Sequence, residues 1–259
     1  MNNSSAAIAI EMRGADKLYP NGVRALQPID LRVREGEIVT LVGPSGCGKS
    51  TLLRLVARLI EPTSGSVMVG PAYRGESGQI AFVFQHPTLM PWARVEANVR
   101  LPLDLAGVGR REAAARIGHA LELVGLQEFR DAYPRELSGG MQMRVSIARA
   151  LATGPRLLLL DEPFGALDEI TRNRLDRDVA ALAAREQLTV LFVTHSIYEA
   201  AFLSARVLVM SPRPGRIIDE LAIDAPQPRQ DGFRASEVFA RACATLSTSL
   251  AAAVEGSRP

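Results

Sequence analysis

The sequence has few of the features that mark membrane-spanning or disulfide-rich proteins. Its longest unbroken apolar run covers only residues 179–184, whereas a helix that crosses a bilayer needs about 20 apolar residues. Cys47 and Cys243 are the only cysteines, and they lie too far apart to indicate a disulfide framework or a metal site. Aromatic residues make up only 5% of the chain. We therefore expect no membrane segment and two free thiols.

The amino terminus also lacks a secretion signal. The run MNNSSAAIAIEMRG has no basic region followed by a sustained apolar stretch and a small-residue cleavage site. The 30 basic residues nearly balance the 28 acidic ones, and the arginines are scattered, so no nucleic-acid surface is indicated. The chain is 47% hydrophobic over 259 residues, which is typical of a globular protein. These features predict a cytosolic protein that binds no nucleic acid.

Apolar runs of strand length alternate with helical patterns over most of the chain. The runs are short and rich in β-branched residues or leucine, as in strands that are buried on both faces. They are residues 38–42, 80–84, 157–160, 188–194 and 206–210. The segment KSTLLRLVARLI, residues 49–60, has helical spacing and follows the first run after a glycine turn. We therefore predict an α/β fold with a mainly parallel sheet covered by helices.

Three segments depart from this alternation. The first forty residues hold short alternating stretches such as ALQPIDLRV, which favour a small antiparallel sheet. Residues 93–140 lack a strand pattern and carry alanine, leucine and arginine at helical spacing, which predicts an inserted helical subdomain. The turn-rich run PQPRQDG precedes a helical pattern over residues 233–254. We accordingly expect a main domain, residues 1–225, followed by a linker and C-terminal helix, residues 226–259.

The strongest motif lies between the first apolar run and the helix that follows it. It reads GPSGCGKST and fits the pattern G-x-x-x-x-G-K-[ST] in the strand–turn–helix context that this pattern requires. Inward backbone N–H groups and the helix N-terminus would hold a triphosphate, Lys49 would reach its outer phosphates, and the Ser50 hydroxyl would bind Mg²⁺. The predicted binding residues are Gly43, Pro44, Ser45, Gly46, Cys47, Gly48, Lys49, Ser50 and Thr51.

Two adjacent carboxylates follow the apolar run LLLL. At the end of that strand, Asp161 is placed to hold Mg²⁺ and Glu162 to orient or deprotonate an attacking water. Taken alone, an acidic pair after a strand more often marks the start of a helix. Together with a triphosphate-binding loop, the pair favours hydrolysis of the nucleotide.

A second glycine motif, LSGGM at residues 137–141, begins a long helical pattern. Locally, Ser138 is expected to cap that helix. The exposed backbone N–H groups of Gly139, Gly140 and Met141 would form a second anion site at the helix start. Because the first loop already binds the chain's own nucleotide, another anion must occupy this second site.

The order of these motifs resembles that of the ATP-binding subunits of ABC transporters, over nearly the whole chain up to about residue 220. GPSGCGKST matches the Walker A motif, LSGGM the signature and LLLLDEP the Walker B motif. The shorter matches are the Q-loop residue Gln85, the D-loop run Ala166-Leu167-Asp168 and the switch histidine His195. Six ordered matches make the resemblance specific.

The resemblance implies a homodimer in which each ATP lies between the Walker A loop of one copy and the LSGGM segment of the other. It also implies that Tyr19 stacks on adenine, that Gln85 contacts Mg²⁺ and the attacking water, and that His195 contacts the γ-phosphate. Asp168 would cross the dimer interface. Without the resemblance, Tyr19 could equally pack on the surface, and Gln85 and His195 could be structural residues at strand ends.

Two positions depart from the family pattern. Met141 stands where glutamine is commoner, which removes a polar side chain but leaves the backbone donors and Ser138 in place. Ser196 follows the switch histidine where an acidic residue is frequent, so no contact of such a carboxylate is carried over. Glu162 is retained, which favours a hydrolysing subunit over a degenerate one.

The segments at residues 84–99 and 193–218 resemble the importer branch that includes nitrate, taurine, alkanesulfonate and pyrimidine-type uptake systems. Such a subunit would work peripherally at the cytoplasmic face of the inner membrane, with separate transmembrane permease subunits and, indirectly, an extracytoplasmic solute-binding protein. The stretch at residues 84–99 carries the only tryptophan, Trp92, and would suit a permease-docking surface. Burial of Trp92 in the core is the alternative, and the sequence favours neither.

The main competing function is a non-transport ABC ATPase that acts as a mechanical clamp on ribosomes or DNA. Such proteins usually carry two cassettes or long coiled-coil insertions, whereas only 20 residues separate Gly140 from Asp161 here. A kinase or GTPase would share the phosphate loop but would not explain LSGGM, and the guanine-reading pattern N-K-x-D is absent. ATP-driven import is therefore the predicted function.

Overall fold

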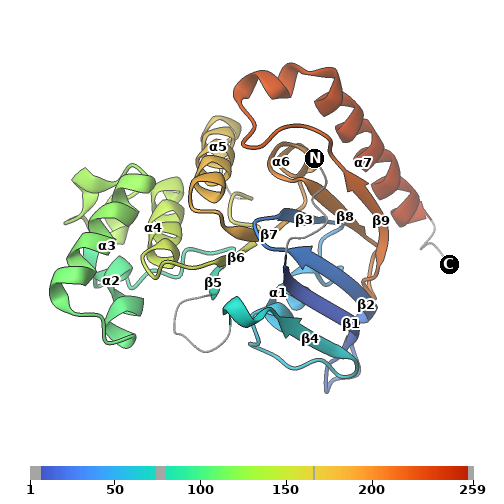
Figure 1. Ribbon diagram of the computed structural model, residues 1–259, viewed down its shortest axis with the longest axis horizontal. Helices are drawn as coiled ribbons and strands as arrows, with labels where there is room; N and C mark the ends of the chain where they lie inside the picture. The colour runs from blue at the N-terminus through green and yellow to red at the C-terminus, as the bar shows by residue number, and fades with distance from the viewer. Residues whose placement is uncertain (1–6, 74–79, 166, 256–259) are drawn as a thin grey trace.

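A six-stranded sheet with the order β5-β6-β7-β3-β8-β9 forms the centre of the protein. The computed structural model describes residues 7–73, 80–165 and 167–255, so Ala166 and parts of both predicted domains lie outside it. Five strands are parallel, and β9 pairs antiparallel with β8 at one edge (Figure 1). The strands are β3 Ile38–Val42, β5 Ile80–Val83, β6 Leu157–Asp161, β7 Thr189–Thr194, β8 Arg206–Met210 and β9 Ile217–Ala222. The predicted mainly parallel sheet is confirmed.

Alternate residues of the central strands enter two separate hydrophobic cores. Val39 and Leu41 of β3 share one core with helix α1 (Lys49–Val56). Ile38 and Val42 belong to the other, with helices α5 (Glu169–Arg185) and α6 (Ile197–Leu203). Strands β3, β6 and β7 are buried along their whole length. Their continuous apolar runs therefore reflect burial on both faces of a parallel sheet.

A small antiparallel sheet with the order β2-β1-β4 covers the α1 side of the protein. Its strands are β1 Ile8–Leu18, β2 Arg24–Arg34 and β4 Ser66–Val69, and the 3-10 turn η1 (Pro71–Tyr73) follows the last of them. The antiparallel sheet expected in the first forty residues is confirmed, and β4 extends it from a later part of the chain.

Three helices form a separate group at one end of the protein, shown at the left of Figure 1. They are α2 (Val95–Leu105), α3 (Arg110–Leu123) and α4 (Gly139–Leu151), with the 3-10 turns η2 (Gln127–Phe129) and η3 (Pro134–Glu136) between α3 and α4. Their apolar faces pack together in the core that also contains part of β5. Among the helices of the described chain, none is long and apolar enough to cross a membrane.

The sequence pattern misplaced several element boundaries. Helix α1 ends at Val56 rather than residue 60, because Arg58 adopts a left-handed conformation with φ 57° that stops the helix. The C-terminal helix α7 covers Glu237–Glu255, and the 3-10 turn η4 (Asp231–Ala235) precedes it. Strand β9 went unrecognised because most of its residues are exposed, so it has no buried apolar run.

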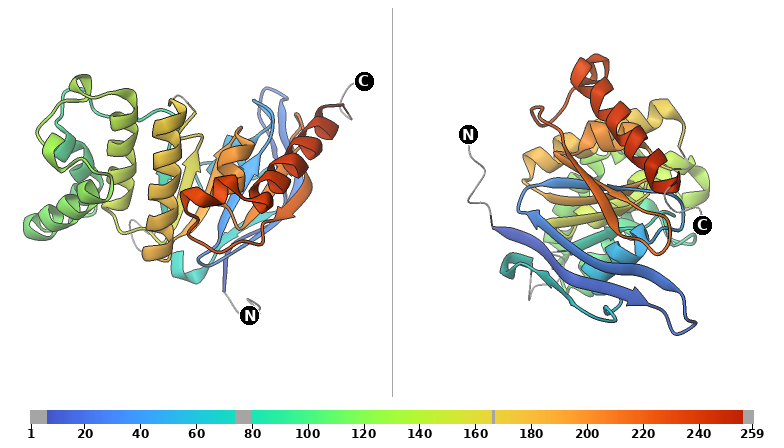
Figure 2. Two further views of the ribbon diagram at one scale, coloured as in Figure 1. Left: turned by 90° about the horizontal axis from the view of Figure 1, so that it is seen from above. Right: turned by 90° about the vertical axis from the view of Figure 1, so that its right-hand side faces the viewer.

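The segment after residue 225 is fixed to the main domain through the buried residue Arg229. Its guanidinium donates hydrogen bonds of 2.8–3.2 Å to the carbonyl oxygens of Ala201, Phe202, Ser204 and Ile223. Burial lowers the pKa of Arg229 to about 10. Helix α7 then lies beside α6 in both views of Figure 2 and shares its core. The end of α6 is thus capped by a side chain from the C-terminal segment.

Replacing Arg229 by Met should lower the free energy of unfolding by about 2–4 kcal/mol, because four buried carbonyls lose a charged donor. Urea unfolding followed by circular dichroism measures the change. The matched control is Arg241→Met, since Arg241 has a side chain that is 70% exposed. The control should lose no more than about 0.5 kcal/mol. Equal stabilities of the two variants would contradict a capping role for Arg229.

Candidate nucleotide-binding site

The candidate site lies at the edge of the sheet where four parallel strands end. The strand register aligns the carboxyl ends of β5, β6, β7 and β3, so the segments that follow them emerge side by side. These segments carry the predicted residues: the glycine loop after β3, Gln85 after β5, Glu162 after β6 and His195 after β7. Residues that are far apart in the sequence are thereby brought to one face.

The loop after β3 wraps its carbonyl groups around a buried ammonium. Lys49 is 4% exposed, and its Nζ donates hydrogen bonds to the carbonyl oxygens of Gly43 (2.9 Å) and Pro44 (3.1 Å). Helix α1 begins at Lys49, directly after Gly48, which has φ 109°. Burial raises the pKa of the Cys47 thiol in the same loop. The loop therefore places a fixed cation at a helix N-terminus, the arrangement that binds phosphate.

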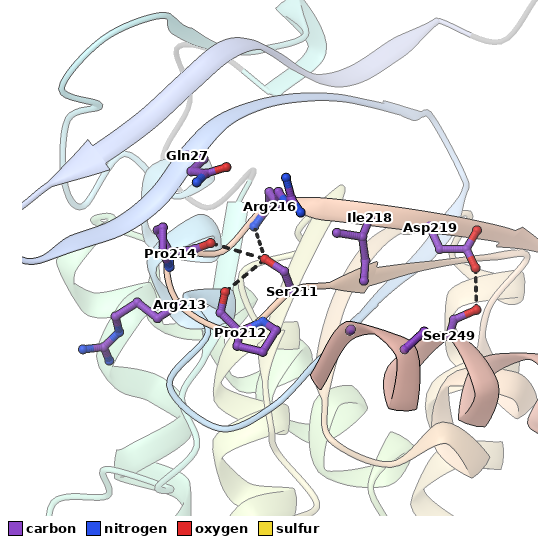
Figure 3. Close-up of a pocket in the computed structure, with 11 residues that line it drawn as sticks. Gln27, Ser211, Pro212, Arg213, Pro214, Arg216, Ile218, Asp219 and Ser249 are labelled. Carbon is purple, nitrogen blue, oxygen red and sulfur yellow. Dashed lines mark hydrogen bonds between the residues drawn. The ribbon is translucent and has the colours of Figure 1, made fainter. Parts of the chain in front are cut away.

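The turn between β8 and β9, residues 211–216, packs against this loop. Arg213 donates from Nε to the carbonyl oxygen of Gly46 at 3.0 Å. A Cβ on Gly215 would lie 2.0 Å from the carbonyl oxygen of Cys47, so only glycine fits against the loop. The Ser211 hydroxyl bonds to backbone atoms of the same turn and holds its shape (Figure 3). The conformation of the phosphate loop thus depends on this turn.

Ser50 and Asp161 have the donor atoms that Mg²⁺ prefers. The Ser50 hydroxyl donates to Oδ1 of Asp161 at 2.7 Å. Burial raises the pKa of Asp161, an effect that the Ser50 hydrogen bond opposes. The described residues contain no cluster of three His, Cys, Asp or Glu side chains that could enclose a metal. A hydroxyl and one buried carboxylate fit Mg²⁺, which is commonly bound by few protein oxygens together with substrate phosphates.

The Glu162 carboxylate lies between two nitrogen groups. Its Oε1 is 3.3 Å from Nζ of Lys49, and its Oε2 is 3.0 Å from Nδ1 of His195. The backbone of Glu162 has φ 45°, a conformation that is costly for a residue other than glycine and that recurs at functional sites. The strained backbone and the two contacts aim this carboxylate at the space beside the phosphate loop.

Tyr19 and Gln85 lie at the margin of the site. Tyr19 is half-buried, and its hydroxyl is 3.4 Å from Oγ1 of Thr51 on α1. Gln85 is exposed just beyond the end of β5. Both positions are compatible with the expected contacts to adenine and to the metal, which stay predictions.

A second hollow, of about 330 Å³, is lined by residues 138–141 of the LSGGM segment and by Leu167 and Asp168 of the predicted D-loop. Ser138 caps α4 as predicted, since its hydroxyl accepts from the N–H of Met141 at 3.3 Å. Asp168 caps α5 by accepting from the N–H of Thr171 at 2.9 Å, and this bond lowers the pKa of Asp168. None of residues 43–51 lines this hollow. The phosphate loop and the N-terminus of α4 therefore line separate spaces.

The exposure of Trp92 excludes one of the two alternatives for this residue, burial in the core. Its side chain is 77% exposed, so it does not belong to the core. Asn98, which is fully buried, holds the loop below it by donating to the carbonyl oxygens of Met90, Ala93 and Arg94. The loop thus presents a large aromatic side chain to solvent.

Sequence reasoning missed the residues that support these loops from outside the motifs. Besides Arg213 and Gly215, they include Arg172 on α5 and Glu199 on α6, which form an ion pair of 3.2 Å. Both belong to helical stretches without a motif of their own. Nothing in a single sequence shows that they meet.

Comparisons with known proteins agree with this fold. A family model described as ABC transporter matches residues 26–165. The chain is 50% identical over 212 residues to the aliphatic sulfonates import ATP-binding protein of Pseudomonas savastanoi pv. phaseolicola, covering 81% of this chain and 85% of that protein. It is 48% identical over 205 residues to the nitrate import ATP-binding protein of Synechocystis sp., covering 79% and 77%. A solved dimeric ATP-binding cassette with bound ADP and phosphate matches with a TM-score of 0.74 and 32% identity, over 84% of this chain and 100% of that chain.

Replacing Gly48 by Ala should weaken ATP binding about tenfold or more. The new Cβ would lie 2.7 Å from Cδ2 of Leu26 and 2.8 Å from the carbonyl oxygen of Ala25, at a φ of +109°. Clash and strain of about 1–3 kcal/mol would displace the phosphate loop. Titration with a fluorescent ATP analogue measures the affinity. Gly107→Ala is the control, because Gly107 has φ +70° but no atom within 4 Å of its Cβ position. Unchanged affinity in the Gly48 variant would contradict the loop assignment.

Proposed function

The chain belongs to the ABC transporter family, and from this premise we propose that it is the ATP-hydrolysing subunit of an importer. It powers the uptake of a small solute through a separate membrane permease. The convergence of Lys49 and His195 on the Glu162 carboxylate, at the mouth of a phosphate loop, is the observation that carries this proposal. A protein that only bound nucleotide would not need this carboxylate in a strained backbone position.

In the proposed reaction, ATP binds with its phosphates on residues 43–51 and its adenine against Tyr19. Glu162 accepts a proton from the attacking water and orients it toward the γ-phosphate. Lys49 and His195 stabilise the charge on the phosphate oxygens. Both side chains contact the Glu162 carboxylate, so all three groups lie together at the phosphate loop. The rate gain is mainly electrostatic and positional.

Mg²⁺ is the proposed cofactor of this reaction. Ser50 and Asp161 would hold it, with Gln85 at the margin of the site as a further oxygen ligand. When bound, the ion would neutralise part of the charge of the phosphates. The 2.7 Å hydrogen bond between Ser50 and Asp161 shows that these two oxygen donors already lie close together.

We infer that the working unit is a homodimer with ATP at its interface. The Ser138–Met141 helix start lines a hollow apart from the phosphate loop, so it is available to the nucleotide of a second copy. The γ-phosphate would draw the two copies together, and its loss on hydrolysis would release them. Moving such an equilibrium from mostly open to mostly closed takes about 5.5 kcal/mol, which several charge-assisted hydrogen bonds can supply.

The permease would dock on the surface near Trp92. A groove of about 670 Å³ is lined mainly by apolar side chains of β5 and α2, including Leu105, and by Phe84 just after β5, with Arg116, Arg149 and Thr153 as polar lining residues. Leu105 is 81% exposed and Trp92 is 77% exposed, which suits contact with an apolar partner. The protein would then work at the cytoplasmic face of the inner membrane, with an extracytoplasmic solute-binding protein delivering the solute.

The sulfonate- and nitrate-import proteins among the relatives favour import over a mechanical clamp on ribosomes or DNA. No surface of this chain is proposed to touch the solute. Solute selection would rest with the permease and the solute-binding protein.

Replacing Glu162 by Gln should slow ATP hydrolysis by about 10²–10⁴-fold, because the water loses its base. ATP should still bind and should hold the variant as a dimer, which light scattering detects with Mg²⁺ and ATP. Glu122→Gln, an exposed carboxylate on α3, is the activity control. Lys49→Ala should neither bind ATP nor dimerise. A Glu162 variant with normal turnover would contradict the catalytic assignment.

A further inference from the structure

The loop that carries His195 is held on both sides by Glu199. On one side, the Thr194 hydroxyl donates to the Glu199 carboxylate and also accepts from the N–H of Ser196 at 3.0 Å. On the other side, the N–H of Glu199 donates to the Ser196 hydroxyl at 3.3 Å. Residue 194 is therefore bonded to the buried Glu199 side chain and residue 196 to the Glu199 backbone, which leaves His195 between them facing Glu162 at 3.0 Å.

The segment that carries Asp168 reaches the same carboxylate through Arg172. The Arg172 Nη2 donates to the carbonyl oxygen of Leu167, the residue before Asp168, at 2.7 Å. Its Nε lies 3.2 Å from Oε1 of Glu199. The Arg172 guanidinium thus contacts Leu167 of the predicted D-loop through Nη2 and Glu199, which bonds to the His195 loop, through Nε.

We propose that Arg172 and Glu199 form a positioning pair that holds the His195 loop and the Asp168 segment in a fixed mutual arrangement. Neither side chain contacts the reacting groups themselves. This inference deepens the proposed ATPase function and rests on it. Through this pair, the Asp168 segment expected at the dimer interface and the His195 loop expected at the γ-phosphate would move together.

Because the Glu199 carboxylate is buried, its position depends strongly on its ion pair with Arg172. The Glu199 side chain is 4% exposed and that of Arg172 is 26% exposed. Burial raises the pKa of Glu199, whereas the Thr194 hydrogen bond and the charge of Arg172 lower it. Removing Arg172 would leave a buried carboxylate with its hydroxyl donor but without its cation, a change that displaces or protonates the group. The His195 loop would then lose its fixed position.

The test compares Arg172→Met, Glu199→Gln and the double variant in ATP turnover and in ATP affinity. Each single change should lower kcat by about 10–100-fold, because a small misplacement of a reacting group is costly. The dissociation constant of ATP should change by less than about threefold, since the phosphate loop is untouched. The double variant should be no slower than the slower single variant, because both changes break one support. Arg172→Lys should recover part of kcat by retaining the charge.

Arg206→Met is the matched control for loss of a partly buried ion pair. Arg206 pairs with Glu37 at 2.9 Å, with side-chain exposures of 23% and 15%, and with Glu220 at 3.0 Å. It begins β8, at the end of the sheet opposite to the His195 loop. This variant should lose stability but keep kcat within about twofold. Equal losses of kcat in the Arg206 and Arg172 variants, or additive losses in the double variant, would overturn the proposal.

Hydrogen exchange at the Ser196 amide separates this proposal from the proposed function. That amide bonds to Thr194, which in turn bonds to Glu199, whereas the Arg172 side chain bonds to the carbonyl oxygen of Leu167 and pairs with Glu199. Its exchange should accelerate about tenfold or more in Arg172→Met and not in Arg206→Met. An inactive wild-type chain would refute the ATPase function without changing this result. Unchanged exchange in Arg172→Met would refute the positioning pair even in an active enzyme.

Discussion

The parallel pairing of β5, β6, β7 and β3 is the constraint on which the site depends. It ends four strands at one edge, so the phosphate loop, the Glu162 carboxylate and His195 meet although they are distant in the chain. Strands β3, β6 and β7 are buried along their whole length, which fixes their ends between the two hydrophobic cores. The turn between β8 and β9 then packs Gly215 closely against the carbonyl of Cys47 in the phosphate loop.

The positions of the two glycine motifs explain why one chain would form only part of the proposed site. The phosphate loop belongs to the central sheet, whereas the Ser138–Met141 helix start belongs to the group of helices at the end of the protein. Within the described chain these two anion sites line different spaces. A second copy supplies the missing half in the proposed dimer, and the γ-phosphate acts as the removable contact between them. The ion pair of Arg172 and Glu199 would couple the Asp168 segment at the proposed dimer interface to the position of His195.

Sequence patterns predicted the parts of the molecule that depend on local chemistry. The loop from Gly43 to Thr51 is recognisable because its glycines, lysine and hydroxyl must occupy adjacent positions. The buried strands were recognisable from apolar runs. The ion pair between Arg172 and Glu199 was not, because it joins two helices that only the fold brings together. Strand β9 was missed since its exposed residues carry no pattern, and the exposure of Trp92 followed only from the packing of the loop around Asn98.

The most direct measurement of the central claim mixes two variants that are each inactive. Lys49→Ala disables the phosphate loop, and Ser138→Arg blocks the helix start that would receive the partner's nucleotide. A mixed dimer would contain one site with both defects and one site with neither. ATP hydrolysis measured after mixing should therefore recover, while each variant alone stays inactive. A mixture that remains as inactive as its components would contradict an ATP site shared between two copies of this chain.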